Sequence, residues 1–224
     1  MMSLPLDAKT SARWPLPAGI AAPLVYAGVV LLGGALTPGY SHRDDPISAL
    51  METGAPARAL IDPLFAVYDL LLVAFALGLR RGFARTGVDL PATVPVSLAL
   101  VGVAGLLTWP LPMDPVGGAA SPTGIAHIAL AGAQSLGTLV AILSAGMALN
   151  KTRAWPWLSL YCFATASLLL ATGMVAGAAA ATNGPLAGLW ERLTIGAFQQ
   201  WLVVIAVVGL LSRPDSGNAA PRAL

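Results

Sequence analysis

The stretch Tyr40–Leu50, with the sequence YSHRDDPISAL, gathers side chains that can do chemistry in a chain otherwise rich in Ala, Leu, Val and Gly. The imidazole of His42 and the carboxylates of Asp44 and Asp45 can exchange protons or serve as ligands of a divalent metal. Polar groups at this density beside apolar segments are costly to keep, which favours a functional reason for their presence. We therefore expect a polar site in or near this stretch.

Two later patches carry the same kinds of groups. Asp114 lies in WPLPMDP, and His127 follows it at the start of the next apolar segment as a candidate metal ligand, general base or structural histidine. Glu191 and Arg192 lie in GLWERL, where a glutamate in the first helical turn would suit the helix dipole. An arginine at this place predicts a carboxylate partner, with Asp114 or Asp62 expected, or a bound anion such as a lipid phosphate. No H-x-x-x-H or H-E-x-x-H spacing occurs, so the metal prediction rests on residue type alone.

Three apolar segments each carry a polar stripe that begins at the same predicted membrane face. Residues seven apart in a helix share one face and lie about 10 Å apart along its axis. If the stripes converge, they line a cavity open to that face. The stripes are Asp62 with Asp69, His127 with Gln134, and Glu191 with Thr194 and Phe198.

The composition predicts an all-α, multi-pass membrane protein. The chain is 57% hydrophobic and 10% charged, whereas soluble domains are about 25% charged. Six apolar segments reach about 18 residues or more, the length of a helix that crosses ~30 Å of hydrocarbon. A net charge of +2 gives no indication of nucleic-acid binding, and the lone Cys162 forms no internal disulfide. The segments are 18–37, 59–79, 94–111, 124–149, 155–181 and 188–211, flanked by predicted tails 1–17 and 212–224.

The basic residues predict the orientation in a cytoplasmic (inner) membrane. Nine lie on one side of the segments and three on the other, which puts both termini and both tails in the cytoplasm by the positive-inside rule. The acids and both histidines favour the outer side. The nine are Lys9, Arg13, Arg80, Arg81, Arg85, Lys151, Arg153, Arg213 and Arg222, and the three are Arg43, Arg58 and Arg192. In the first outer loop, Asp45 followed by Pro46 predicts a capped short helix over 46–52 that lies on the membrane surface.

Taken in order, YSHRDDPISAL, WPLPMDP with its downstream Gly124–His127, and GLWERL resemble the prokaryotic membrane family catalogued as domain of unknown function 998. The resemblance covers about residues 20 to 212 and implies a bundle of six transmembrane helices. It brings no established activity. The positions that it carries over are Ser48, Asp114, His127 and the pair Glu191–Arg192. The DD and METGAPAR sequences of the first loop depart from the family pattern.

Three classes of function follow from these observations. The first is a hydrolase or transferase acting on a lipid-linked or amphiphilic substrate, with a divalent metal as one expected cofactor. The second is a binding or transport module, in which Asp69 and Gln134 mark a path into the bundle. The third is a regulatory partner of other membrane proteins. The candidate catalytic residues are His127, Asp114, Asp62, Glu191, Arg192 and His42, and the candidate metal ligands are His127, Asp114, His42, Asp44 and Asp45.

Overall fold

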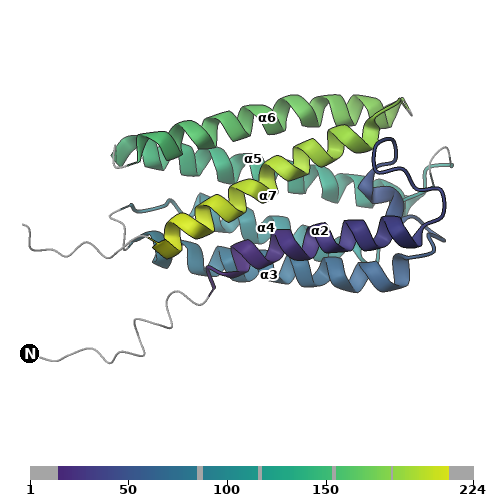
Figure 1. Cartoon of the computed structure of the whole chain (residues 1–224), viewed down its shortest axis with the longest axis horizontal. Coiled ribbons are helices and arrows are strands. Elements are labelled where there is room, and N and C mark those ends of the chain that lie inside the picture. Colours follow the sequence, from purple (N-terminus) through teal and green to yellow (C-terminus); the bar gives the residue numbers. More distant parts are fainter. Residues whose placement is uncertain (1–14, 85–87, 116–117, 153–154, 183, 212–224) are drawn as a thin grey trace, which may run out of the picture.

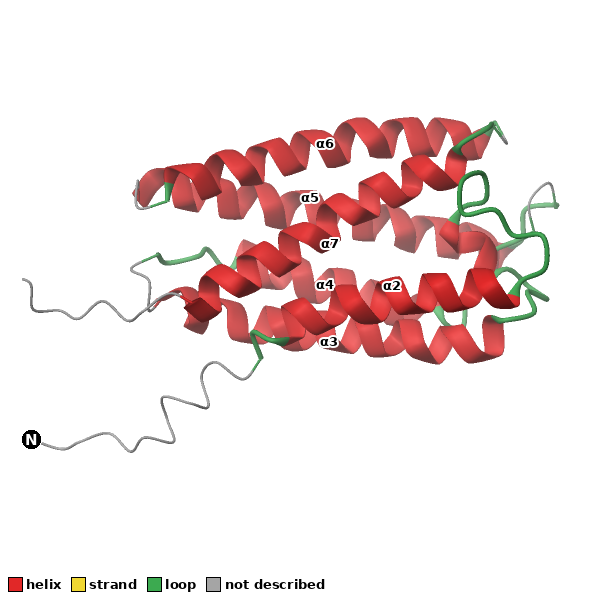
Figure 2. Cartoon of the chain, viewed as in Figure 1, coloured by secondary structure: helices red, strands yellow, loops and turns green. Residues whose placement is uncertain are grey.

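The all-helical prediction is confirmed by the computed structural model, which describes residues 15–84, 88–115, 118–152, 155–182 and 184–211. No strand occurs in these ranges, where two extended residues, Glu52 and Met113, form an isolated bridge. The elements are α2 (Ala18–Leu36), the 3-10 helix η1 (Ile47–Met51), α3 (Arg58–Ala84), α4 (Thr93–Thr108), α5 (Pro122–Thr152), α6 (Pro156–Ala181) and α7 (Ala187–Leu211). Figure 2 shows the loops gathered at the two ends of the bundle.

The six long helices close into a ring. Each helix packs on the next one along the chain, and α2 packs on α7, which joins the last helix to the first (Figure 1). Fully buried side chains such as Phe75, Leu149 and Trp201 fill the part of the ring where α3, α5 and α7 end. The η1 helix lies at the other end, hereafter the η1 end.

Helix α4 is shorter than expected. Five helices are long and apolar enough to cross a membrane, but Thr93–Thr108 has only 16 residues. The prediction of about 18 residues or more is therefore wrong for this segment. Pro110 accounts for the early end, because its ring nitrogen cannot donate the backbone hydrogen bond that would continue the helix.

The predicted surface helix over 46–52 is corrected to the 3-10 helix Ile47–Met51, and Asp45 does not cap it. Pro46 has extended backbone angles, and the Asp45 carboxylate accepts a hydrogen bond from the Ser41 N–H at 2.7 Å. Ile47 and Leu50 are buried against α2 and α3, so packing holds η1 in place.

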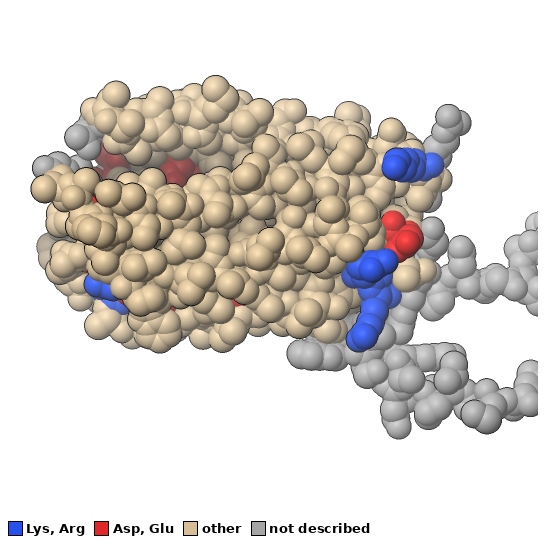
Figure 3. Space-filling model, turned by 180° about the vertical axis from the view of Figure 1, so that it is seen from behind, with Lys and Arg blue, Asp and Glu red and all other residues tan. Residues whose placement is uncertain are grey.

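The sides of the bundle are apolar and the charges lie mainly at its ends. The leucines most exposed on these sides include Leu24, Leu77 and Leu160, each at 70% or more, as expected for lipid-facing positions. Figure 3 shows basic side chains at both ends of the body and acidic side chains inside a recess. This distribution is that of a multi-pass membrane protein. Of the nine basic residues predicted to face the cytoplasm, Arg80, Arg81 and Lys151 are described, and the other six lie outside the described residues.

Candidate functional site: a cavity within the helix ring

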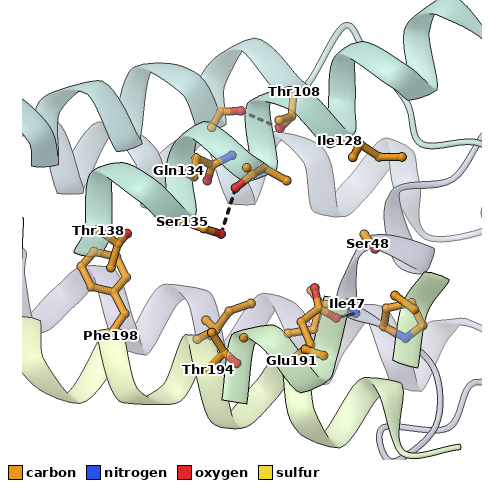
Figure 4. A pocket seen from close by; sticks show the side chains of 18 of the residues that line it. Ile47, Ser48, Thr108, Ile128, Gln134, Ser135, Thr138, Glu191, Thr194 and Phe198 are labelled. Carbon is orange, nitrogen blue, oxygen red and sulfur yellow. Dashed lines mark hydrogen bonds between the residues drawn. The ribbon is translucent and has the colours of Figure 1, made fainter. Parts of the chain in front are cut away.

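A cavity of about 640 Å³ lies inside the ring in its η1 half. All six long helices and η1 contribute to its wall, and α5 and α7 face one another across it (Figure 4). Most of the wall is apolar or made of small residues. Its polar members include Asp69, Glu191, His127, Gln134, Gln199, Ser48, Ser135, Thr138 and Thr194.

Asp69 on α3 is the most unusual member of this wall. Its side chain is only 4% exposed, and its carboxylate has no hydrogen-bond or ion-pair partner among the described residues. Gly105 of α4 provides the room for it, because an added Cβ at Gly105 would collide with the carboxylate group. A buried carboxylate without a partner is costly, so its position in a cavity wall points to a ligand.

Glu191 on α7 lines the same cavity and also holds η1, which closes the cavity at this end and which we call its roof. Its carboxylate accepts a hydrogen bond from the Ile47 N–H at 2.5 Å, at the start of η1. Because α7 begins at Ala187, Glu191 lies beyond the first turn, and the alternative reading of a first-turn acid that serves the helix dipole is wrong. The acid instead supplies the acceptor that Asp45 was expected to give to this short helix.

Arg192 lies outside the cavity and holds the loop between α2 and η1 onto α7. It donates hydrogen bonds to the carbonyl oxygens of Asp45 at 3.0 Å and Gly188 at 2.9 Å, to the Tyr40 hydroxyl at 2.5 Å, and to Nδ1 of His42 at 3.1 Å. The prediction that Arg192 pairs with Asp114 or Asp62 is wrong, because Arg192 takes part in none of the ion pairs among the described residues. Carbonyl and hydroxyl oxygens and the His42 ring accept from its two terminal nitrogens instead, and its Nε is buried without a hydrogen-bond partner among the described atoms.

Tyr40 takes part in the same contact between the loop and α7. We call this contact, formed by Arg192, Tyr40 and His42, the latch. Its hydroxyl donates to the Pro46 carbonyl oxygen at 3.0 Å, and its ring stands edge-on to His42. Burial raises the pKa of Tyr40 above its ordinary value, which opposes loss of the proton that makes this bond. His42 therefore contributes to the latch and not to the cavity.

His127 on α5 is 4% exposed and lines the cavity. Its Nδ1 lies 2.8 Å from the Leu111 carbonyl oxygen. A carbonyl can only accept, so Nδ1 carries the proton, and Nε2 of the neutral ring is left as a hydrogen-bond acceptor or base.

Asp114 builds the start of α5 and does not line the cavity. Its two carboxylate oxygens accept hydrogen bonds from the Ser121 N–H at 2.8 Å and the Ser121 hydroxyl at 2.6 Å, and these bonds lower the pKa of Asp114. The Ser121 hydroxyl in turn accepts from the Gly124 N–H at 3.1 Å, the bond expected of a helix cap. A Cβ at Gly124 would collide with the Asp114 carboxylate, which accounts for the glycine three residues before His127.

Asp62 is paired with Arg58 one turn earlier, at 2.9 Å from Nε. Its other oxygen, Oδ1, is buried without a hydrogen-bond partner among the described atoms. Asp62 borders a second, water-sized recess of about 10 Å³, whose wall also includes Asp69. The two acids of α3 thus face neighbouring spaces.

The candidate residues therefore fall into groups. His127, Glu191 and Asp69 line one cavity, Asp62 borders the recess beside it, and Arg192 with His42 forms the latch. Asp44 accepts hydrogen bonds from the Leu186 N–H and the Ser41 hydroxyl, in the loop at the η1 end. Among the residues that the structure describes, no group of three His, Cys, Asp or Glu side chains is placed to hold a metal ion.

Sequence reasoning missed Gln199 and Tyr68. Gln199 lines the cavity, donates to the Tyr68 hydroxyl at 3.0 Å, and has its Oε1 buried without a described partner. A signal was present, because Gln199 lies eight residues after Glu191 and so continues its helix face.

Comparison of the chain with known proteins gives one match, to a protein family. No curated protein and no solved structure matches the chain. A family model with the description "Protein of unknown function (DUF998)" matches residues 20–208, which span all six long helices except the ends of the first and last. The chain therefore belongs to the DUF998 family of membrane proteins.

Proposed function

We propose that the protein is a membrane-embedded binding module, of the transport or sensing kind, that holds a cationic amphiphile in the cavity of the helix ring. The observation that carries this proposal is Asp69, a nearly fully buried carboxylate that lines the cavity without a described partner. The cavity volume of about 640 Å³ falls in the range of about 300–1,000 Å³ that is typical of small-molecule sites.

The charge of the wall favours a positively charged polar group on the ligand. Asp69 and Glu191 belong to the wall, and no lysine or arginine is found among its described residues. An ammonium group would offset these carboxylates in surroundings of low dielectric constant, where an unpaired charge is costly. The amides of Gln134 and Gln199 can orient the group, and the apolar remainder of the wall suits a hydrocarbon chain.

A second candidate is a hydrolase or transferase that acts on a lipid-linked or amphiphilic molecule in the same cavity. The orientation of His127 favours it, because Nδ1 is held by the Leu111 carbonyl and Nε2 is left as a base. Ser48 of η1 lines the cavity as well, but no hydrogen bond joins Ser48 to His127 in the described contacts. The binding function needs only the groups already in the wall.

The test is equilibrium binding of radiolabelled dodecylamine to the purified protein in nanodiscs. We expect saturable binding that Asp69→Asn weakens by about tenfold or more, equivalent to ~1.4 kcal/mol, because the amide offers no compensating charge. Dodecanol and dodecyl sulfate, which have the same chain, should bind more weakly than the amine.

Asp89→Asn is the matched control, since it makes the same chemical change at an exposed carboxylate outside the cavity and should bind dodecylamine like the wild type. Equal affinity of Asp69→Asn and the wild type would reject the proposal. Conversion of the probe into a new species, detected by mass spectrometry, would assign the cavity to the enzyme class instead.

A further inference from the structure

The cavity is closed toward the η1 end by its roof, the helix η1, which hydrogen bonds hold in place. Ile47, Ser48 and Met51 of η1 belong to its wall, and Glu191 holds the first residue of η1. The preceding loop is bound to α7, because the carbonyl oxygens of Arg43 and Asp44 accept hydrogen bonds from the backbone at the start of that helix, and Arg192 adds the latch to Tyr40. A ligand that came straight from the aqueous phase at this end would have to displace these bonds.

The side of the cavity between α5 and α6 is open. These two helices pack tightly near their connection, where the Ser159 hydroxyl donates to the Gly146 carbonyl at 2.9 Å and a Cβ at Gly146 would meet the Cys162 Cβ at 3.0 Å. Toward the η1 end the same helices separate. Gly132 of α5 and Gly177 of α6 line the cavity, are exposed, and would have no atom within 4 Å of an added Cβ.

The rim of this opening is made mostly of small side chains, with the exposed Ile128 of α5 as a larger member, on helices that otherwise face lipid. Its exposed members that also line the cavity include Ala131, Gly132, Ser135, Gly177, Ala180 and Ala181. Leu136 and Met174 flank them with exposures of 63% and 69%. Figure 3 shows a recess on this side of the body, beneath the edge formed by α6, with acidic side chains visible inside it.

We propose that the cavity exchanges its ligand with the bilayer through this opening, which we call the α5–α6 portal. This inference rests on the proposed function and adds the route and the kind of molecule. The ligand is a bilayer resident with one hydrocarbon chain, which lies across the small-residue rim while its ammonium group reaches Asp69. With the orientation that the basic residues predict, the portal faces the outer leaflet.

A bulky side chain at Gly177 tests the route. The probe is an alkylamine with a fluorophore at the far end of its chain, and its association and dissociation rates are measured in nanodiscs by stopped flow. Gly177→Phe should slow both rates by about tenfold, which corresponds to ~1.4 kcal/mol of barrier, and change Kd much less. A side chain that narrows a route slows both directions, whereas one that fills the site raises Kd.

Gly28→Phe on α2 is the matched control, because Gly28 also has open space around an added Cβ but does not line the cavity. It should leave both rates unchanged. Gly132→Phe, on the opposite side of the rim, provides a second variant if Gly177→Phe fails to fold.

The outcomes separate the two proposals. Wild-type rates in a folded Gly177→Phe or Gly132→Phe protein, together with lost binding in Asp69→Asn, would overturn the portal and leave the binding function standing. A raised Kd with an unchanged association rate would likewise overturn the portal. Unchanged binding in Asp69→Asn would overturn the binding function itself.

Discussion

Asp69 and Glu191 are the two acids of the cavity wall, and their surroundings give them different roles. Asp69 lies against Gly105 and makes no described hydrogen bond, so its carboxylate is available to a ligand. Glu191 already accepts a hydrogen bond from the Ile47 N–H, so it serves the roof as well as the wall. The two roles of Glu191 can be separated by substitution.

Glu191→Gln keeps an oxygen that can accept from Ile47 but removes the negative charge. We expect a melting midpoint close to that of the wild type and weaker dodecylamine binding. Glu191→Ala removes the acceptor and leaves the Ile47 N–H without a partner, which should destabilise the protein by about 1–3 kcal/mol. Thermal unfolding in detergent, with binding measured on the same samples, distinguishes the cases. Equal midpoints for the two variants would mean that this hydrogen bond does not hold η1.

At the scale of elements, the start of α5 depends on Asp114, Ser121 and Gly124. Two bonds from Ser121 to the carboxylate and one from Gly124 to the Ser121 hydroxyl connect the preceding loop to the first turn. The charge of Asp114 thus holds the helix that presents His127 to the cavity.

This connection should weaken in acid. The folded state lowers the pKa of Asp114, so its contribution to stability is complete above the unfolded value of about 3.9 and is lost as pH falls through the folded value. Protection factors of the Ser121 and Gly124 amides in hydrogen exchange should therefore decrease at the acid end of a titration from neutral pH. Asp114→Asn, which does not titrate, should show no such step, and the same step in both proteins would assign it to another group.

At the scale of the whole molecule, the two ends of the helix ring carry different groups. Arg80, Arg81 and Lys151 lie near the C-terminal ends of α3 and α5, while the latch and the roof occupy the η1 end. The excess of basic residues predicts that the η1 end faces outward.

Reporter fusions test that orientation. A reporter fused after residue 120 should read as exterior, and one fused after residue 152 as cytoplasmic, because these positions lie at opposite ends of α5. The reverse pattern would place the portal in the inner leaflet and contradict the positive-inside assignment.

The helices were predictable from the sequence because apolar length and helical period depend on local composition. The positions of Asp69, Gln134 and Glu191 in one cavity wall agree with the stripes read from their spacing. The partners of Arg192 were not predictable, because they are backbone carbonyls brought close by the fold of a distant loop. The portal was also not predictable from the sequence, because Gly132 and Gly177, which border an open space, are the same residue type as Gly146, which lies in a tight contact.

Helix α4 has a consequence for the surrounding lipid. Sixteen residues give an apolar rod of about 24 Å, against a hydrocarbon core of ~30 Å, while its neighbours α3 and α5 have 27 and 31 residues. A bilayer accommodates such a hydrophobic mismatch by local thinning or by flanking side chains that reach its surface, and each ångström of mismatch carries a small free-energy cost. Because α4 packs on α5, one wall of the portal, a change in bilayer thickness that alters this mismatch acts on a helix that borders the opening.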